Sequence, residues 1–204
     1  GFSMSCKQLP IDHAWLLAQA LTQQLPWLID EPLAHIHPIQ VAISSNGWNR
    51  PDDAQHQVLV PSRRTRLYLR LPKPRIEDAK ALCGKTLSLG GYGLTVGEAK
   101  AKLLQNYPVI SARYVASHDQ ETEDDFMQRI AHEIHHLTGI KIKKMLCGKS
   151  YQLHRPAGAL LTRHLMIADL DNDTCIQLQQ QGLGGERLLG CGLFLPHKGI
   201  KAQD

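Results

Sequence analysis

The chain has 204 residues, of which 43% are hydrophobic and 21% charged, so it is an ordinary globular protein with room for one domain or two small ones. No apolar run approaches the roughly 18 residues that a membrane-spanning helix needs, and the first ten residues lack the apolar core of a signal peptide. Five scattered cysteines, none in a C-x-x-C pair, argue against a disulfide framework and a cysteine zinc site. We therefore expect a cytoplasmic protein with no membrane partner.

The first half of the chain predicts strands and helices in the order β-α-β-β-α-β. Residues 2–9 predict a strand, 10–25 a helix capped by Asp12, 36–44 and 65–72 two more strands, 75–84 a short helix, and 85–97 a hairpin. Residues 65–72 alternate polar and apolar side chains, as a half-buried strand does.

The second half predicts the same order again. The elements are a strand at 111–117, a helix at 121–139, strands at 140–146 and 159–169 joined by a hairpin at 147–158, a helix at 171–181 and a strand at 191–196. The repeated order predicts an α+β fold of two tandem ferredoxin-like modules of the RRM/RAMP type, residues 1–100 and 108–204.

The net charge is only +4, but the basic residues are concentrated in two acid-free stretches. The first lies between Asp53 and Glu77, and the second lies between Glu133 and Asp169. Two basic blocks on a modestly basic protein indicate a surface that binds a polyanion, although solvated charge on strand edges would give the same pattern.

Residues 132–136 read H-E-x-x-H, which is the opening of a zinc-protease signature. Phe126, Ile130 and Ile134 form the apolar stripe of the same predicted helix, so His132 and His136 should point away from the core. A third histidine ligand of the metzincin type would stand at position 142, where the chain has isoleucine. We therefore expect no metal site here, and a zinc peptidase is the weakest of the functions considered.

The C-terminal stretch "QGLGGERLLGCGLFLPHKG" has five glycines between residues 182 and 192. Because glycine has no β-carbon, its backbone N–H groups can approach a ligand closely and form an anion-binding concavity. Arg187 and Lys198 flank the stretch. It lies between the last predicted helix and the last predicted strand of a ferredoxin-like module. This position favours an anion-binding loop over a loop that is merely flexible.

Three histidines of the first module are candidates for proton transfer. Pro38 stiffens the chain directly after His35 and His37, at the start of a predicted strand. His13 lies in the first turn of the first predicted helix, where the helix dipole lowers an imidazole pKa and favours the neutral form.

Six segments carry a resemblance to a known family: "PIDHAWLLAQAL", "IHPI" followed by "NGWNRP", "SRRTRLYLRLP", "KMLCGK", "TRHLMIADLD" and "LQQQGLGGERLLGCGLFLPHKG". They run nearly from end to end of the chain. Together they resemble the CRISPR-associated repeat endoribonucleases, the sixth Cas family of the RAMP superfamily, and most closely its MYXAN subtype.

This resemblance implies cofactor-independent and metal-independent cleavage of CRISPR repeat RNA (pre-crRNA), with the product often retained among the subunits of a surveillance complex. The family's general acid/base histidine matches His37 first, His13 second and His35 third. The glycine loop and the basic strands imply RNA contacts at Arg63, Arg64, Lys143, Lys144, Lys149, Arg155, Arg163, Gly182, Gly184, Gly185, Arg187, Gly190, Gly192 and Lys198.

The implied chemistry is attack of a 2′-hydroxyl on the adjacent phosphate, which gives a 2′,3′-cyclic phosphate and a 5′-hydroxyl end. Histidine suits the proton transfers, and lysine or arginine suits the developing charge. The alternative is a non-catalytic RNA-binding RAMP subunit of a CRISPR effector complex, with the same glycine loop but no working histidine. Whether the chain forms a homodimer is left open by the sequence.

Overall fold

The computed structural model describes residues 1–41 and 58–197. Two compact units divide the chain, Gly1–Lys102 and Leu103–Asp204, and each is described by itself below. The predicted RNA contact Lys198 and part of the predicted strand at 36–44 lie outside the described residues. Nowhere in the described ranges does a helix combine the length and apolar character that a membrane span requires.

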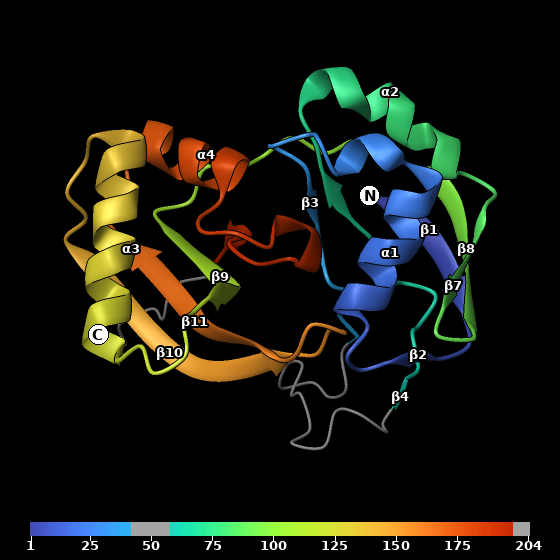
Figure 1. Cartoon of the computed structure of the whole chain (residues 1–204). Helices are drawn as coiled ribbons and strands as arrows, with labels where there is room; N and C mark the ends of the chain where they lie inside the picture. The colour runs from blue at the N-terminus through green and yellow to red at the C-terminus, as the bar shows by residue number, and fades with distance from the viewer. Residues whose placement is uncertain (42–57, 198–204) are drawn as a thin grey trace, which may run out of the picture. The chain divides into compact units, whose positions relative to one another are not determined.

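Unit 1 has short strands and helices on the right of Figure 1. In chain order its regular elements are β1 (Phe2–Cys6), β2 (Leu9–Pro10), α1 (Ala14–Gln24), β3 (His35–Ile36), β4 (Val58–Leu59), β5 (Arg66–Leu67), β6 (Leu69–Arg70), α2 (Ile76–Ala79), β7 (Thr86–Leu89) and β8 (Tyr92–Ala99). Short 3-10 turns occupy Pro26–Leu28, Lys73–Arg75 and Lys80–Leu82.

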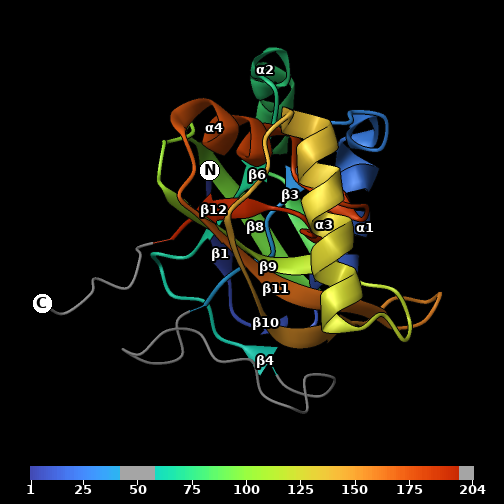
Figure 2. The same cartoon turned by 90° about the vertical axis from the view of Figure 1, so that its left-hand side faces the viewer.

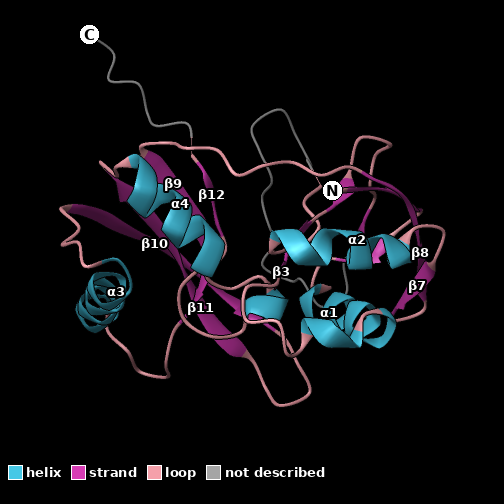
Figure 3. Cartoon of the chain, turned by 90° about the horizontal axis from the view of Figure 1, so that it is seen from above, coloured by secondary structure: helices cyan, strands magenta, loops and turns pink. Residues whose placement is uncertain are grey.

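The main sheet of unit 1 has the order β5-β1-β8-β7, with every neighbouring pair antiparallel. β6 follows β5 after one residue and pairs with β3, so the split β-α-β unit of a ferredoxin-like module is complete. Figure 3 shows α1 and α2 beside β7 and β8. On α1, Leu17 and Leu21 are fully buried, and Leu67 on β5 is buried as well.

Three local predictions for unit 1 were wrong. The first strand ends at Cys6, because residues 9–10 leave the main sheet and pair with β4 instead. The N-cap position of the first helix is His13, whose side chain makes no capping hydrogen bond, whereas Asp12 had been expected at that position. The predicted helix at 75–84 is only one α-helical turn between two 3-10 turns.

Unit 2 is the more regular of the two. Its elements are β9 (Val109–Ala116), α3 (Glu123–Thr138), β10 (Lys144–Leu153), β11 (Leu160–Ala168), α4 (Asn172–Gln181), a 3-10 turn (Arg187–Leu189) and β12 (Phe194–Pro196). The sheet order is β10-β11-β9-β12, all antiparallel, which is the ferredoxin-like order. In Figure 2, α3 lies in front of β9, β10 and β11.

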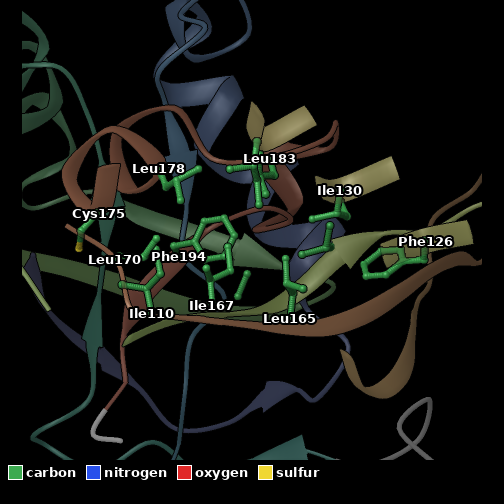
Figure 4. Close-up of a cluster of buried hydrophobic side chains, with 13 residues drawn as sticks. Ile110, Phe126, Ile130, Leu165, Ile167, Leu170, Cys175, Leu178, Leu183 and Phe194 are labelled. Atoms are coloured by element: carbon green, nitrogen blue, oxygen red, sulfur yellow. The ribbon is translucent and has the colours of Figure 1, made fainter. Parts of the chain in front are cut away.

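The core of unit 2 lies between this sheet and the two helices. Phe126, Ile130 and Ile134 of α3 are fully buried against strand residues such as Leu165 and Ile167, as the apolar stripe predicted. Figure 4 shows that Leu178 of α4 and Leu183 of the following loop join the same cluster. The glycine-rich stretch is therefore anchored to the core at its first apolar residue.

The predicted hairpin at 147–158 was wrong, because β10 continues through it to Leu153. The strand pairing shifts register between Cys147 and Ser150, which is a bulge rather than a turn. A β-carbon at Gly148 would stand 2.7 Å from Nδ1 of His164, so the small residue here serves close packing across the sheet.

Candidate active site and nucleic-acid interface

His13 is buried, with 2% of its surface exposed, and both of its ring nitrogens are engaged. Nε2 accepts a hydrogen bond from the backbone N–H of Ile39 at 2.8 Å, so Nδ1 carries the proton. Nδ1 then donates to the carbonyl oxygens of Pro10 and Ile11, at 2.9 and 3.0 Å. His13 therefore connects the start of α1 to the segment just after His37, and it does not present a ring nitrogen to a ligand.

We expect His13→Ala to lower the free energy of unfolding by about 2 kcal/mol, because it leaves one buried N–H and two carbonyls without these partners. Urea denaturation followed by circular dichroism measures the change. His132→Ala, which removes an exposed histidine from α3, is the matched control and should change little. Wild-type stability in His13→Ala would show that the ring is not a structural clamp.

His35 and His37 differ in their access to solvent. His35 is 1% exposed, and its Nδ1 lies 3.4 Å from the carbonyl of Leu33. His37 is only partly buried, and its backbone N–H donates to the carbonyl of Tyr68 at 3.1 Å. Its ring lies 5.8 Å, centroid to centroid, from the Tyr68 ring. Of the three candidates, His37 is the one that is not fully buried.

The surroundings of His37 keep its imidazole neutral. Burial of the imidazole is the main cause that lowers its pKa to about 3, and the positive charge of Arg70 adds to the effect, followed by His35. Arg70 is itself 9% exposed, and burial lowers its pKa to about 10, so its guanidinium is still charged at neutral pH. The neutral imidazole of His37 therefore lies close to the positive charge of Arg70.

The predicted basic contacts fall into two groups: side chains that are exposed to solvent, and arginines that already bind other parts of unit 2. Arg63 and Arg64 lie exposed before β5, and Lys143 and Lys149 are exposed at and near β10. Lys144 forms a 2.7 Å ion pair with Asp169, but both side chains are more than half exposed, so the pair is weak and open to exchange with a phosphate. These side chains are available to a polyanion.

Two predicted RNA-binding arginines instead hold parts of unit 2 together. Arg163 donates to the carbonyl of Glu121 at 2.6 Å and to Oγ of Ser117 at 3.3 Å, and its guanidinium lies over the Phe126 ring. Arg155 forms a short ion pair with Glu186 of the glycine loop. We do not carry the RNA-contact prediction forward for Arg163, because these partners already use the guanidinium.

The glycine loop is ordered by its own backbone. The N–H groups of Gly182, Gly190 and Gly192 donate to the carbonyls of Leu178, Arg187 and Tyr114, so these three predicted contacts have no N–H to offer a ligand. Gly184 and Gly185 are exposed. The part of the loop that can contact a phosphate is therefore residues 184–188, which includes Arg187.

A comparison with protein families identifies the chain. The family model described as Cas6 Crispr matches residues 1–199. The chain belongs to the Cas6 family. A CRISPR-associated endonuclease Cas6 of Myxococcus xanthus (strain DK1622) is 27% identical over 188 residues, which are 92% of this chain and 76% of that relative. The predicted family is thus confirmed.

Solved structures of related proteins confirm the tandem ferredoxin-like fold. A structure described as an RAMP protein binding different RNA substrates has a TM-score of 0.60 at 15% identity, covering 95% of this chain and 98% of that one. The product of a Cas6-related gene from Pyrococcus furiosus has a TM-score of 0.57 at 14% identity, covering 100% of both chains. At these identities the likeness concerns the fold.

In this Cas6 family member, the described residues supply the H-E-x-x-H segment with no further metal ligand. His132 and His136 are exposed on α3, as the helix periodicity predicted. Within the described ranges, no cluster of three or more His, Cys, Asp or Glu side chains is arranged to hold a metal ion. Glu133, the middle residue of the segment, is instead hydrogen-bonded to the glycine loop.

Tyr68 and Arg70 were not among the predicted site residues of this Cas6 family member. Both lie on the strand segment that pairs with β3, where Arg70 is opposite His35. The signal was present in "TRLYLRLP", because residues two apart on a strand share a face. The sequence did not show that this face meets the histidine segment, which depends on the pairing of β3 with β6.

Proposed function

We propose that the chain is a metal-independent endoribonuclease that cleaves CRISPR repeat RNA to guide RNA, leaving 2′,3′-cyclic phosphate and 5′-hydroxyl ends. The observation that carries this proposal is a neutral His37, packed against the Tyr68 ring and near the Arg70 cation, in a member of the Cas6 family. The Myxococcus xanthus relative is named an endonuclease, which supports the same reaction class.

In the proposed reaction, His37 accepts the proton of the attacking 2′-hydroxyl. Its low pKa keeps the ring unprotonated before RNA binds, and a nearby phosphate would raise that pKa toward the range where proton transfer is efficient. The imidazolium formed in this way holds the proton that the leaving 5′-oxygen requires. Arg70 stabilises the negative charge of the phosphorane, and the Tyr68 ring orients the imidazole.

RNA binding is proposed to use the exposed cations and the open part of the glycine loop. Arg63, Arg64, Lys143 and Lys149 would contact phosphates, which gives affinity without reading sequence. Residues 185–188 would bind a phosphate through backbone N–H groups. Retention of the product with other CRISPR effector subunits and a cytoplasmic location belong to the same proposal.

The test uses an end-labelled RNA carrying one cognate repeat, incubated with the protein in excess EDTA. We expect a single cut, because no step of the proposed reaction uses a metal ion. A matched RNA with one 2′-deoxy sugar at the cut site should bind equally but stay intact, because the nucleophile is missing. Denaturing gels read cleavage, and filter binding reads affinity.

The other outcomes separate the alternatives. Loss of cleavage in EDTA, with recovery on adding Mg²⁺, would contradict the metal-independent mechanism. Tight binding of both RNAs without any cut would identify a non-catalytic RNA-binding subunit, in which case the proposed role of His37 falls and the RNA contacts stand.

A further inference from the structure

Glu133 of α3 reaches the glycine loop and holds it at its exposed tip. One carboxylate oxygen, Oε1, accepts a hydrogen bond from the backbone N–H of Gly184 at 2.5 Å. The two residues are 51 positions apart in the chain, so the contact joins separate elements of unit 2. A carboxylate accepting from a backbone N–H is among the stronger hydrogen bonds of proteins.

The carboxylate of Glu133 lies at the edge of a partly buried ionic network. Arg129, one turn earlier on α3, lies with Nη1 3.9 Å from the second oxygen of Glu133. The same guanidinium donates to both oxygens of Glu121, at 2.7 and 3.0 Å, and to the carbonyl of Ala116 on β9. These bonds from Arg129 are the main cause that lowers the pKa of Glu121 to about 2, so the pair of Arg129 and Glu121 is charged at all physiological pH values.

The geometry points to Glu133 as a positioning residue: we propose that its carboxylate holds the glycine loop in the shape that accepts an RNA phosphate at residues 185–188. This inference rests on the function proposed above. The N–H groups of Gly182, Gly190 and Gly192 donate to α4, to the loop itself and to β9, whereas the N–H of Gly184 at the exposed tip donates to α3. A fixed loop binds its ligand more tightly, because less conformational freedom is lost on binding.

A direct role in binding RNA is unfavourable for this side chain. A carboxylate near a phosphate repels it, so a residue chosen for charge at this place would be a lysine or arginine. The residue at this position is instead Glu133, and Arg129 partly compensates its negative charge. Glu133 therefore contributes through its hydrogen bond with Gly184, whereas its negative charge weakens the binding of RNA.

Two conservative variants of Glu133 separate the effect of its side-chain length from the effect of its negative charge. Glu133→Gln keeps the length of the side chain and an oxygen acceptor but removes the charge, whereas Glu133→Asp keeps the charge but is shorter by one methylene. Both replace a side chain that is 35% exposed on a long helix, so neither should prevent folding. Asp124→Asn is the matched control, because it removes an exposed negative charge from the same helix away from the loop.

The experiment is single-turnover cleavage of end-labelled repeat RNA at increasing protein concentration, which gives the half-saturating concentration and the maximal rate separately. We expect Glu133→Asp to raise the half-saturating concentration about tenfold, the effect of losing one charge-assisted hydrogen bond on loop order. Glu133→Gln should stay within about threefold of wild type. The maximal rate should be unchanged in both, because the loop does not take part in proton transfer.

Other results would overturn the inference. Tighter binding by Glu133→Gln, with Glu133→Asp equal to wild type, would show that the charge matters and the contact does not. Equal behaviour of both variants and Asp124→Asn would show that the loop is independent of α3. A lower maximal rate together with a lower melting temperature would indicate a general structural role. If wild-type protein does not cleave or bind repeat RNA, the proposed function fails, which is distinct from these outcomes.

Discussion

His37→Ala is expected to slow the cleavage of repeat RNA by about 10²–10⁴-fold, the usual contribution of a positioned acid/base side chain. His37 is the only one of the three candidate histidines that is not fully buried, and its ring lies beside Tyr68 and near the charged Arg70. Binding of uncleaved 2′-deoxy RNA should stay within about threefold, because affinity comes mainly from phosphate contacts elsewhere. Single-turnover rates and filter binding with the same RNA preparation measure both quantities.

The control for His37→Ala is His132→Ala, which removes an exposed imidazole from α3 in unit 2. It should cleave at the wild-type rate, so that a general effect of losing a histidine is excluded. Addition of imidazole to His37→Ala should restore part of the rate, since the missing group is a proton acceptor. Wild-type cleavage by His37→Ala would move the proton transfer to another residue.

Gly192→Ala is expected to destabilise the protein more than any other single change considered. The added β-carbon would stand 1.9 Å from the carbonyl oxygen and 2.7 Å from the backbone nitrogen of Leu183. Both are backbone atoms that a side-chain rotation cannot move away. The residue also has φ +67°, a left-handed conformation that costs alanine about 1–2 kcal/mol.

The strain at Gly192 should break two hydrogen bonds, from the N–H of Leu183 to the carbonyl of Gly192 and from the N–H of Gly192 to the carbonyl of Tyr114. We expect a loss of about 3–5 kcal/mol in the free energy of unfolding, with weaker RNA binding as the loop opens. Thermal melts and filter binding measure the two effects.

Gly185→Ala is the matched control for stability, since a β-carbon at that position would meet nothing within 4 Å. Its melting temperature should stay close to that of wild type. A Gly192→Ala protein with wild-type stability would show that the approach of Leu183 to Gly192 is not required for the folded state.

The order of elements could be predicted from the sequence because hydrophobic periodicity is local. Phe126, Ile130 and Ile134 mark one face of α3, and the same spacing placed His132 and His136 on the opposite, exposed face. The errors in the elements came where local signals were ambiguous. Gly148 and Lys149 resemble turn residues, yet they form a bulge within β10, where the missing β-carbon of Gly148 leaves room for His164 on the neighbouring strand.

The candidate site, like the fold, was predicted from the sequence only in part. The sequence by itself determined the family, the fold and the three candidate histidines, because these depend on residue types and their spacing along the chain. Only the tertiary structure decided that His13 is a buried clamp, that Arg163 holds the loop before α3, and that Glu133 bonds to Gly184. The physical reason is that each of these roles is set by a hydrogen bond between residues 26 or more positions apart, and such contacts exist only once strands have paired and helices have packed.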